Sequence, residues 1–151
     1  MIPDTGTTGN YVAMDTPLLN EHPITNSPTV ILPNGSTTTA THAGLLDIPH
    51  LSAKAKLAYK FPNFQKALLS LSTICDEGGT AIFNKHNMHI LHNGRIILKG
   101  IRDTSTGLWL VPISKHQSTL NKTNLPELVT KLSNTVAQAV IETTRTKQEL
   151  V

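Results

Sequence analysis

The sequence predicts a mostly β domain over residues 1–113, followed by a separate amphipathic helix. Short β-prone runs alternate in this domain with turns that are rich in Gly, Pro and Asn. Hydrophobic residues make up 38% of the 151-residue chain and charged residues only 15%, so one core can form and the composition is not that of a disordered chain. Aromatic residues amount to 4%, so we expect the core to consist of Leu, Ile, Val and Ala.

Two β-hairpins are predicted, each from a turn signal that separates two β-prone runs. The first covers residues 29–41 around the turn Pro33-Asn34-Gly35, and the second covers residues 88–98 around Asn93-Gly94. Further short strands are expected at residues 45–49, 80–83 and 108–112.

One short helix is expected at residues 70–77. Ser70 is suited to cap its N-terminus, and Gly78-Gly79 is a stop signal. Cys75 lies in this mostly apolar run, so we expect a small buried side chain there rather than a reactive thiol. Residues 51–60 are rich in Ala and Lys and remain ambiguous between helix and strand.

Apolar residues recur at spacings of three and four between residues 125 and 142, which is typical of one face of an amphipathic helix. The recurring positions are Leu125, Leu128, Val129, Leu132, Val136 and Val140. Because the polar face is not strongly basic, a loosely attached packing or linker helix is favoured over a membrane-binding or calmodulin-binding one. We therefore divide the chain into a domain at residues 1–113 and a linker with helix at residues 114–151.

Several classes of partner are not expected. The net charge is +3 and the isoelectric point about 9.1, but no run of Lys and Arg is interleaved with aromatic residues, so nucleic acid is not an expected partner of this segment. No apolar stretch approaches the roughly 20 residues of a membrane helix, and no signal peptide is recognisable. The single cysteine excludes an intrachain disulfide and fits a reducing compartment such as the cytoplasm.

His86, His89 and His92 form a His-x-x-His-x-x-His row, a spacing that raises the question of a metal site. On a strand, however, His89 and His92 would point to opposite faces, and no Cys or carboxylate nearby completes a ligand set. The row is therefore interpreted as the polar surface of a hairpin, and neither a metal ion nor another cofactor is expected.

Asp4-Thr5-Gly6 is the motif with the clearest chemistry. Gly permits a tight turn, Thr can fix the turn by hydrogen bonding, and the turn carries the Asp carboxylate into a cleft. Two such carboxylates that face each other share one proton, so one acts as a base on a water molecule while the other acts as an acid. Taken alone, the tripeptide is more typical of an exposed loop near a chain terminus, where Asp, Thr and Gly are common, so its interpretation depends on the rest of the chain.

The motifs that accompany Asp4-Thr5-Gly6 follow one order and rough spacing. They are Asp4 to Thr8, Pro23-Ile24, Val30 to Gly35, Ala67 to Leu71, Cys75 to Gly78 and Leu108 to Pro112. Together they resemble the protease region of copia-type retrotransposon polyproteins, in which DSGAT or DTGAT leads to a PNG turn, an LLS segment with a following Asp and Gly, and a closing GLW or GLY strand. The resemblance covers about residues 4–113, and residues 114–151 resemble the spacer that runs towards the integrase region.

The resemblance implies a retropepsin-like acid-protease lobe that works as a homodimer. Asp4, Thr5 and Gly6 would form the catalytic motif, with Asp4 facing its counterpart and Thr5 bracing the two loops. Neither Asp103-Thr104-Ser105 nor Asp76-Glu77-Gly78 repeats the motif, because the first lacks the glycine and the second lacks the hydroxyl.

The implied activity is that of an aspartic endopeptidase that cuts its own Gag-Pol-type polyprotein, in the cytoplasm or in virus-like particles. The residues that bind substrate are not identified by this reasoning. Leu68-Leu69-Ser70 would lie beneath the catalytic loop, with serine at the position of the retropepsin glycine, as in copia-type relatives.

The sequence departs from the family pattern before Asp4, where an apolar strand is expected and only Met1, Ile2 and Pro3 are present. Pro3 also lacks the N–H group that a central strand would use, and Gly9 replaces a frequent serine. We therefore expect weak dimerisation. The alternative functions are a catalytically inactive fragment or domesticated remnant that serves as a dimerising or peptide-binding module, and a nucleic-acid-associated linker, for which the sequence lacks a basic stripe.

Overall fold

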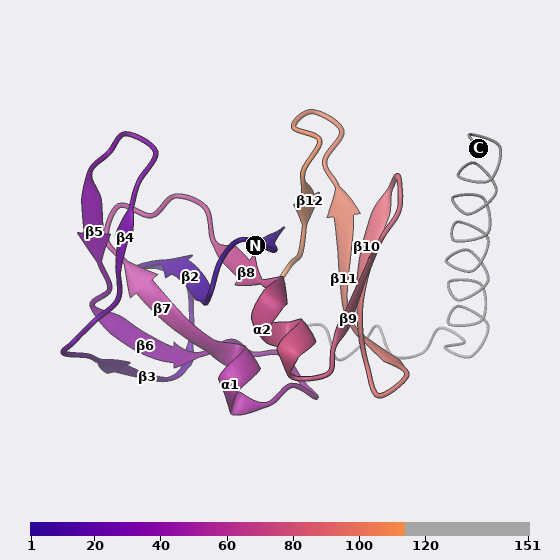
Figure 1. Ribbon diagram of the computed structural model, residues 1–151, viewed down its shortest axis with the longest axis horizontal. Helices are drawn as coiled ribbons and strands as arrows, with labels where there is room; N and C mark the ends of the chain where they lie inside the picture. The colour runs from indigo at the N-terminus through magenta and orange to yellow at the C-terminus, as the bar shows by residue number, and fades with distance from the viewer. Residues whose placement is uncertain (114–151) are drawn as a thin grey trace, which may run out of the picture. The chain divides into compact units, whose positions relative to one another are not determined.

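Strands make up 44% and helices 9% of the residues in the computed structural model, which describes residues 1–113 (Figure 1). The prediction of a mostly β fold is therefore confirmed. The predicted helix at residues 125–142 and the linker that precedes it lie outside the described residues. Within the described range, no helix is both long and apolar enough to cross a membrane.

The larger sheet joins segments that are far apart in the sequence. Its strands lie in the order β1 (Ile2–Asp4), β8 (Leu68–Ser70), β2 (Asn10–Ala13), β7 (Leu57–Phe61), β6 (His42–Leu45) and β3 (Leu19–Pro23). β1 is parallel to β8 and β2 is parallel to β7, while the other neighbours are antiparallel. The strand that ends with Asp4 is thus an edge strand beside β8.

The second sheet is antiparallel and follows the chain order. Its strands are β9 (Thr80–Phe83), β10 (Asn87–His92), β11 (Arg95–Arg102) and β12 (Trp109–Leu110). Asn93 and Gly94 connect β10 to β11 with φ angles of 49° and 72°, as a tight hairpin turn requires. The predicted second hairpin and the predicted strand at residues 80–83 are confirmed.

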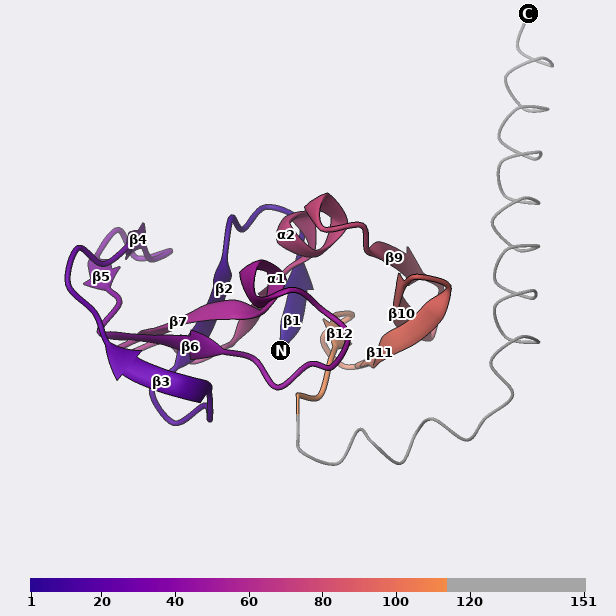
Figure 2. The same cartoon turned by 90° about the horizontal axis from the view of Figure 1, so that it is seen from below.

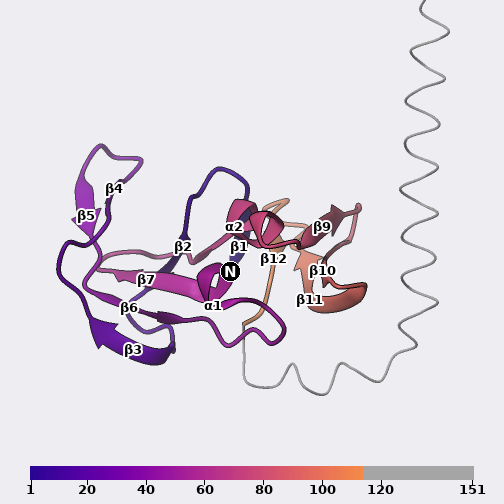
Figure 3. The same ribbon diagram turned by 60° about the horizontal axis from the view of Figure 1, so that its bottom comes forward.

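The hairpin of β4 (Thr29–Ile31) and β5 (Thr37–Thr39) forms a sheet of its own and stands apart from the other strands (Figures 1 and 3). Gly35 has a φ of 82° at its tip, and the Asn34 side chain accepts hydrogen bonds from the N–H and the hydroxyl of Ser36. In the middle of β5, the Thr38 hydroxyl donates to the Pro62 carbonyl at 3.0 Å. The first predicted hairpin is confirmed.

Residues 1–113 contain two short helices, where one was predicted for this range. α2 (Leu71–Asp76) begins after Ser70, whose hydroxyl accepts from the Thr73 N–H, as the capping signal predicted. The additional helix, α1 (Ala53–Lys56), lies in the ambiguous Ala- and Lys-rich run and is capped by Ser52. Cys75 is exposed, contrary to our expectation, because α2 turns Leu71 and Ile74 inward instead.

The strand predicted at residues 45–49 is wrong for most of its length, because β6 ends at Leu45. Leu46 and Ile48 are apolar for a different reason: both side chains are fully buried in the core. The Leu46 N–H donates to the Lys56 carbonyl and the Ile48 N–H donates to the Leu46 carbonyl, so this segment curls instead of pairing as a strand.

Helix α2 lies between the two larger sheets and joins them into one core (Figures 1 and 2). Leu71 and Ile74 belong to a buried cluster that also contains Val12 from the first sheet and Met88 from the second. The buried members of this cluster are aliphatic residues and one methionine, as predicted, while Phe61 is a fully buried aromatic residue outside the cluster. Each fully buried Leu or Ile stabilises the fold by about 2 kcal/mol.

Lys60 is the one charged residue that is buried within residues 1–113. Its Nζ lies 2.6 Å from Oε2 of Glu21, and the two side chains are 5% and 33% exposed. The pair connects β7 to the edge strand β3 across the intervening β6. Burial makes the loss of either partner costly, because the other charge is then left without compensation.

We expect the Glu21→Gln variant to lose about 2 kcal/mol of unfolding free energy, less than for a fully buried pair because Glu21 is partly exposed. The exposed Asp15, with the matched change Asp15→Asn, should shift stability by no more than about 0.5 kcal/mol. Urea unfolding of both variants measures the difference. Equal stabilities would contradict a structural role for the Glu21–Lys60 pair.

Candidate functional site

Asp4 is the last residue of β1, which pairs with β8 along one side and is preceded by Met1, a residue bonded to Val111. Asp4 is opposite Ser70 in the parallel pairing with β8. The Met1 nitrogen donates to the Val111 carbonyl at 2.6 Å and the Val111 N–H donates to the Met1 carbonyl at 2.8 Å. The strand before the catalytic motif, which the sequence analysis took to be missing, is present as Ile2–Asp4, and Pro3 is accommodated because β1 is an edge strand of its sheet.

The Asp4-Thr5-Gly6 turn directs one carboxylate oxygen back onto its own backbone. Asp4 Oδ1 accepts the Gly6 N–H at 2.7 Å, and Asp4 itself is partly buried while Thr5 and Gly6 are exposed. A Cβ atom at Gly6 would lie 3.3 Å from the same oxygen, so the turn is tight around the carboxylate. No ion pair within residues 1–113 involves Asp4, and its Oδ2 has no hydrogen bond there.

The loop after Asp4 is anchored to β8 and α2. The Ser70 hydroxyl and the Ser72 hydroxyl each donate to the Thr7 carbonyl at 2.8 Å. The Ser70 N–H donates to Oδ1 of Asn10 at 2.8 Å, where β2 begins. The structure thus brings the Leu68–Ser70 segment beside the Asp4 loop, as the resemblance implied.

Asn10 is a residue of the site that the sequence analysis missed. It is fully buried, and its Nδ2 donates to the Ala55 carbonyl at 2.9 Å and the Leu57 carbonyl at 2.8 Å, in addition to the bond from Ser70. Asn10 therefore ties the Asp4 loop to the junction of α1 and β7. Because an asparagine that follows a glycine is typical of a turn, the sequence around Asn10 does not indicate that this side chain is buried.

A groove of about 620 Å³ lies beside the loop, between the β4–β5 hairpin and the segment that follows β7. It is lined by Thr7, Tyr11, Val30, Ile31, Leu32, Pro33, Asn34, Asn63, Phe64, Gln65, Lys66 and Leu68. Tyr11 and Phe64 are in edge-to-face contact, with ring centroids 6.4 Å apart. The walls are mainly apolar, as in sites that bind apolar side chains of a ligand.

The three histidines of the row are separated by their environments. His86 is exposed, and Nε2 of His92 lies 3.2 Å from the Glu77 carbonyl at the end of α2. His89 faces Lys99 across β10 and β11, and its Nδ1 is buried without a hydrogen-bond partner. In the described part of the chain, no three His, Cys, Asp or Glu side chains lie together as a metal site requires.

The pKa of His89 is lowered below 6.5, first by burial and second by the positive charge of Lys99. Both effects disfavour the protonated ring, so the folded protein binds this proton less readily than the unfolded chain does.

No family model, curated protein or solved structure matches the chain. The relation to copia-type proteases therefore stays a resemblance in motifs and their order.

We expect Asn10→Ala to lower the unfolding free energy by about 3 kcal/mol or more, because it leaves the Ser70 N–H and two carbonyls without their partner. Asn87→Ala, at an exposed position of β10, should change stability by no more than about 0.5 kcal/mol. Urea unfolding provides the comparison. A small effect of Asn10→Ala would show that the loop does not need this anchor.

A second prediction concerns pH. Because the His89 pKa is lower in the folded protein, the stability associated with neutral His89 is fully present above pH 6.5 and is lost as the pH falls through the folded-state value. The His89→Leu variant should therefore lose less stability between pH 7 and about pH 5 than the unmodified protein. Urea unfolding at both pH values tests this, with His86→Leu as the exposed control; an unchanged pH dependence in His89→Leu would refute it.

Proposed function

We propose that the chain is an aspartic endopeptidase domain of a retropepsin-like type, active as a homodimer. The observation that carries the proposal is the Asp4 turn, in which Oδ1 is held by the Gly6 N–H and Oδ2 is left without a partner among the described residues. The loop that follows is fixed to β8 and α2 by Ser70 and Ser72. A carboxylate with one oxygen fixed and one free is suited to hold a water molecule.

In the proposed reaction, two Asp4 side chains share one proton. The ionised carboxylate removes a proton from a water molecule, whose oxygen forms a bond with the carbonyl carbon of the peptide. The protonated carboxyl donates its proton as charge moves to the carbonyl oxygen. Breakage of the C–N bond then leaves a carboxyl group on one product and an amine, which takes up a proton, on the other.

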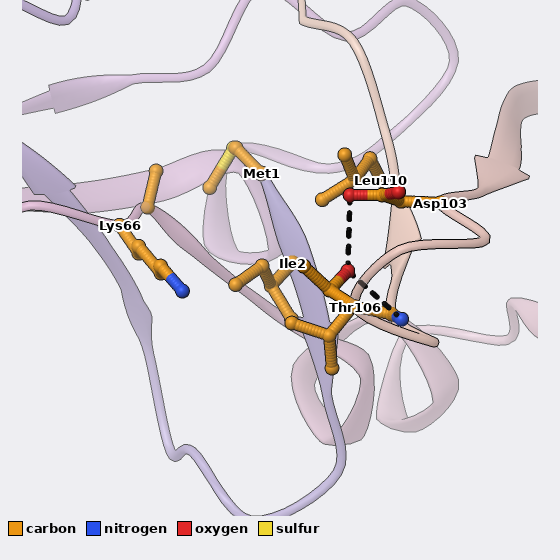
Figure 4. A pocket seen from close by; sticks show the side chains of 8 residues that line it. Met1, Ile2, Lys66, Asp103, Thr106 and Leu110 are labelled. Carbon is orange, nitrogen blue, oxygen red and sulfur yellow. Dashed lines mark hydrogen bonds between the residues drawn. The ribbon is translucent and has the colours of Figure 1, made fainter.

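The pairing requires a second copy of the chain, because residues 1–113 contain one Asp-Thr-Gly. The proposed contact face lies along β1 at a hollow of about 260 Å³, which is lined by Met1, Ile2, Lys66, Ala67, Asp103, Thr106, Leu108 and Leu110 (Figure 4). Leu108 and Leu110 are 36% and 42% exposed. Lys66 and Asp103 lie on opposite sides of the hollow. A two-fold axis through it would therefore place Lys66 of one copy opposite Asp103 of the other copy, and the reverse.

The groove beside the loop supports a polypeptide as the substrate. Its apolar walls would accept apolar side chains of an extended peptide, with Tyr11 and Phe64 on one side. Ile31 of the β4–β5 hairpin, 77% exposed, would be covered by such a peptide.

A second candidate function is a peptide-binding module without catalysis. The same groove favours it, because a peptide can bind there without two Asp4 carboxylates. The two functions differ in one outcome: a module binds peptides that it leaves intact.

We expect the Asp4→Asn variant to abolish peptide cleavage, because an amide cannot take a proton from water. Asp15→Asn, Asp47→Asn and Asp76→Asn should retain the activity of the unmodified protein. Cleavage is measured on unfolded polypeptide at mildly acid pH over a range of protein concentrations, and the rate should rise with the square of concentration where monomers predominate.

Cleavage by Asp4→Asn at the unmodified rate would refute the catalytic assignment. The binding module would be supported instead if the unmodified protein binds peptide but neither it nor any variant cleaves peptide, at concentrations where a dimer is detected.

A further inference from the structure

We propose that Ser72, together with Ser70, is a positioning residue that orients the Asp4 loop through the Thr7 carbonyl; this inference rests on the proposed peptidase function. Neither hydroxyl contacts Asp4 directly. Both act on a backbone oxygen three residues beyond it, at 2.8 Å each.

The hydrogen atoms of the three hydroxyls at this point can be assigned consistently. The Thr7 carbonyl has two acceptor sites, and the Ser70 and Ser72 hydroxyls fill both. Ser70 has then used its only hydroxyl hydrogen, so its oxygen accepts from the Thr73 N–H at 3.3 Å and from the Thr73 hydroxyl at 2.7 Å. With both hydrogens directed at the Thr7 carbonyl, the Ser70 and Ser72 hydroxyl oxygens lie 3.1 Å apart without a hydrogen between them. The two donors together fix the orientation of the Thr7 peptide group.

Ser70 and Ser72 contribute differently. Ser70 is fully buried, caps α2 and is opposite Asp4 in the sheet, so its loss would disturb folding as well as the loop. Ser72 is partly exposed, and its hydroxyl donates to the Thr7 carbonyl and lies 3.1 Å from the Ser70 hydroxyl oxygen. Ser72 is consequently the residue at which the positioning effect can be separated from folding.

The consequence for Asp4 follows from the short distance along the chain. The Asp4 carboxylate is oriented by the Gly6 N–H, and Gly6 precedes Thr7 directly. A rotation of the Thr7 peptide group changes the direction of the loop that carries Gly6. Loss of one hydroxyl should therefore weaken the Asp4–Gly6 hydrogen bond while most of the fold is retained.

The test uses Ser72→Ala and, as the matched control, Ser72→Thr, which keeps the hydroxyl. The amide proton of Gly6 is followed by NMR as the pH is changed, because a proton bonded to a carboxylate shifts when that carboxylate ionises. Asp4→Asn identifies the part of the shift that belongs to Asp4. We expect Ser72→Ala to reduce that part by roughly half or more and Ser72→Thr to retain it.

Cleavage gives the second measurement. Ser72→Ala should lower kcat by about tenfold with KM changed less than about twofold, because misplacement of the carboxylate affects reaction more than binding. Ser72→Thr should restore kcat. A Gly6 shift in Ser72→Ala equal to that of the unmodified protein would overturn the positioning role.

The positioning role of Ser72 and the peptidase function can fail independently of each other. A reduced Gly6 shift in a chain that never cleaves peptide supports the positioning role and refutes the peptidase function. An unchanged Gly6 shift in Ser72→Ala, in a chain that does cleave peptide, refutes the positioning role and supports the peptidase function.

Discussion

The contact between Ser70 and the loop after Asp4 is the constraint on which the site depends. Ser70 meets this loop at three points: the pairing with Asp4, the hydroxyl bond to the Thr7 carbonyl and the N–H bond to Asn10. The same residue begins α2, the helix that lies between the two larger sheets. The position of the Asp4 carboxylate is thereby linked to the core, because a movement of α2 would move the loop as well.

The remaining chemistry depends on a second carboxylate. One aspartate can bind a water molecule, but acid and base action at the same moment requires two groups in different protonation states. Two carboxylates in contact provide this difference because they do not both ionise readily. The geometry of one chain supplies a fixed Asp4 turn and an apolar groove, and the proposed dimer supplies the pairing.

Elements marked by local turn chemistry could be predicted from the sequence. Asn93-Gly94 and Pro33-Asn34-Gly35 specify their hairpins through residues that tolerate positive φ, and Ser70 marks the start of α2. Elements specified by distant contacts could not. β1 is a strand only because β8 and Val111 lie beside it, and Leu46 and Ile48 are apolar because they are buried rather than paired in a strand.

In the candidate site, too, the features set by local sequence were predicted and those set by distant contacts were not. Asp4, Thr5 and Gly6 were found because the motif is contiguous. Asn10 was missed because its three hydrogen bonds reach partners 45 to 60 residues away, which no local pattern reveals. The groove was likewise missed, since it is formed by the β4–β5 hairpin and a segment some 30 residues further along the chain.

The most direct test of the central claim is a mixing experiment. The unmodified protein is held at a fixed concentration at which it cleaves peptide, and increasing amounts of Asp4→Asn chain are added and equilibrated. If the active site is formed by two Asp4 residues from two chains, mixed dimers form and activity falls towards zero as the inactive chain comes into excess. Activity that stays constant, however much Asp4→Asn chain is added, would contradict the shared site.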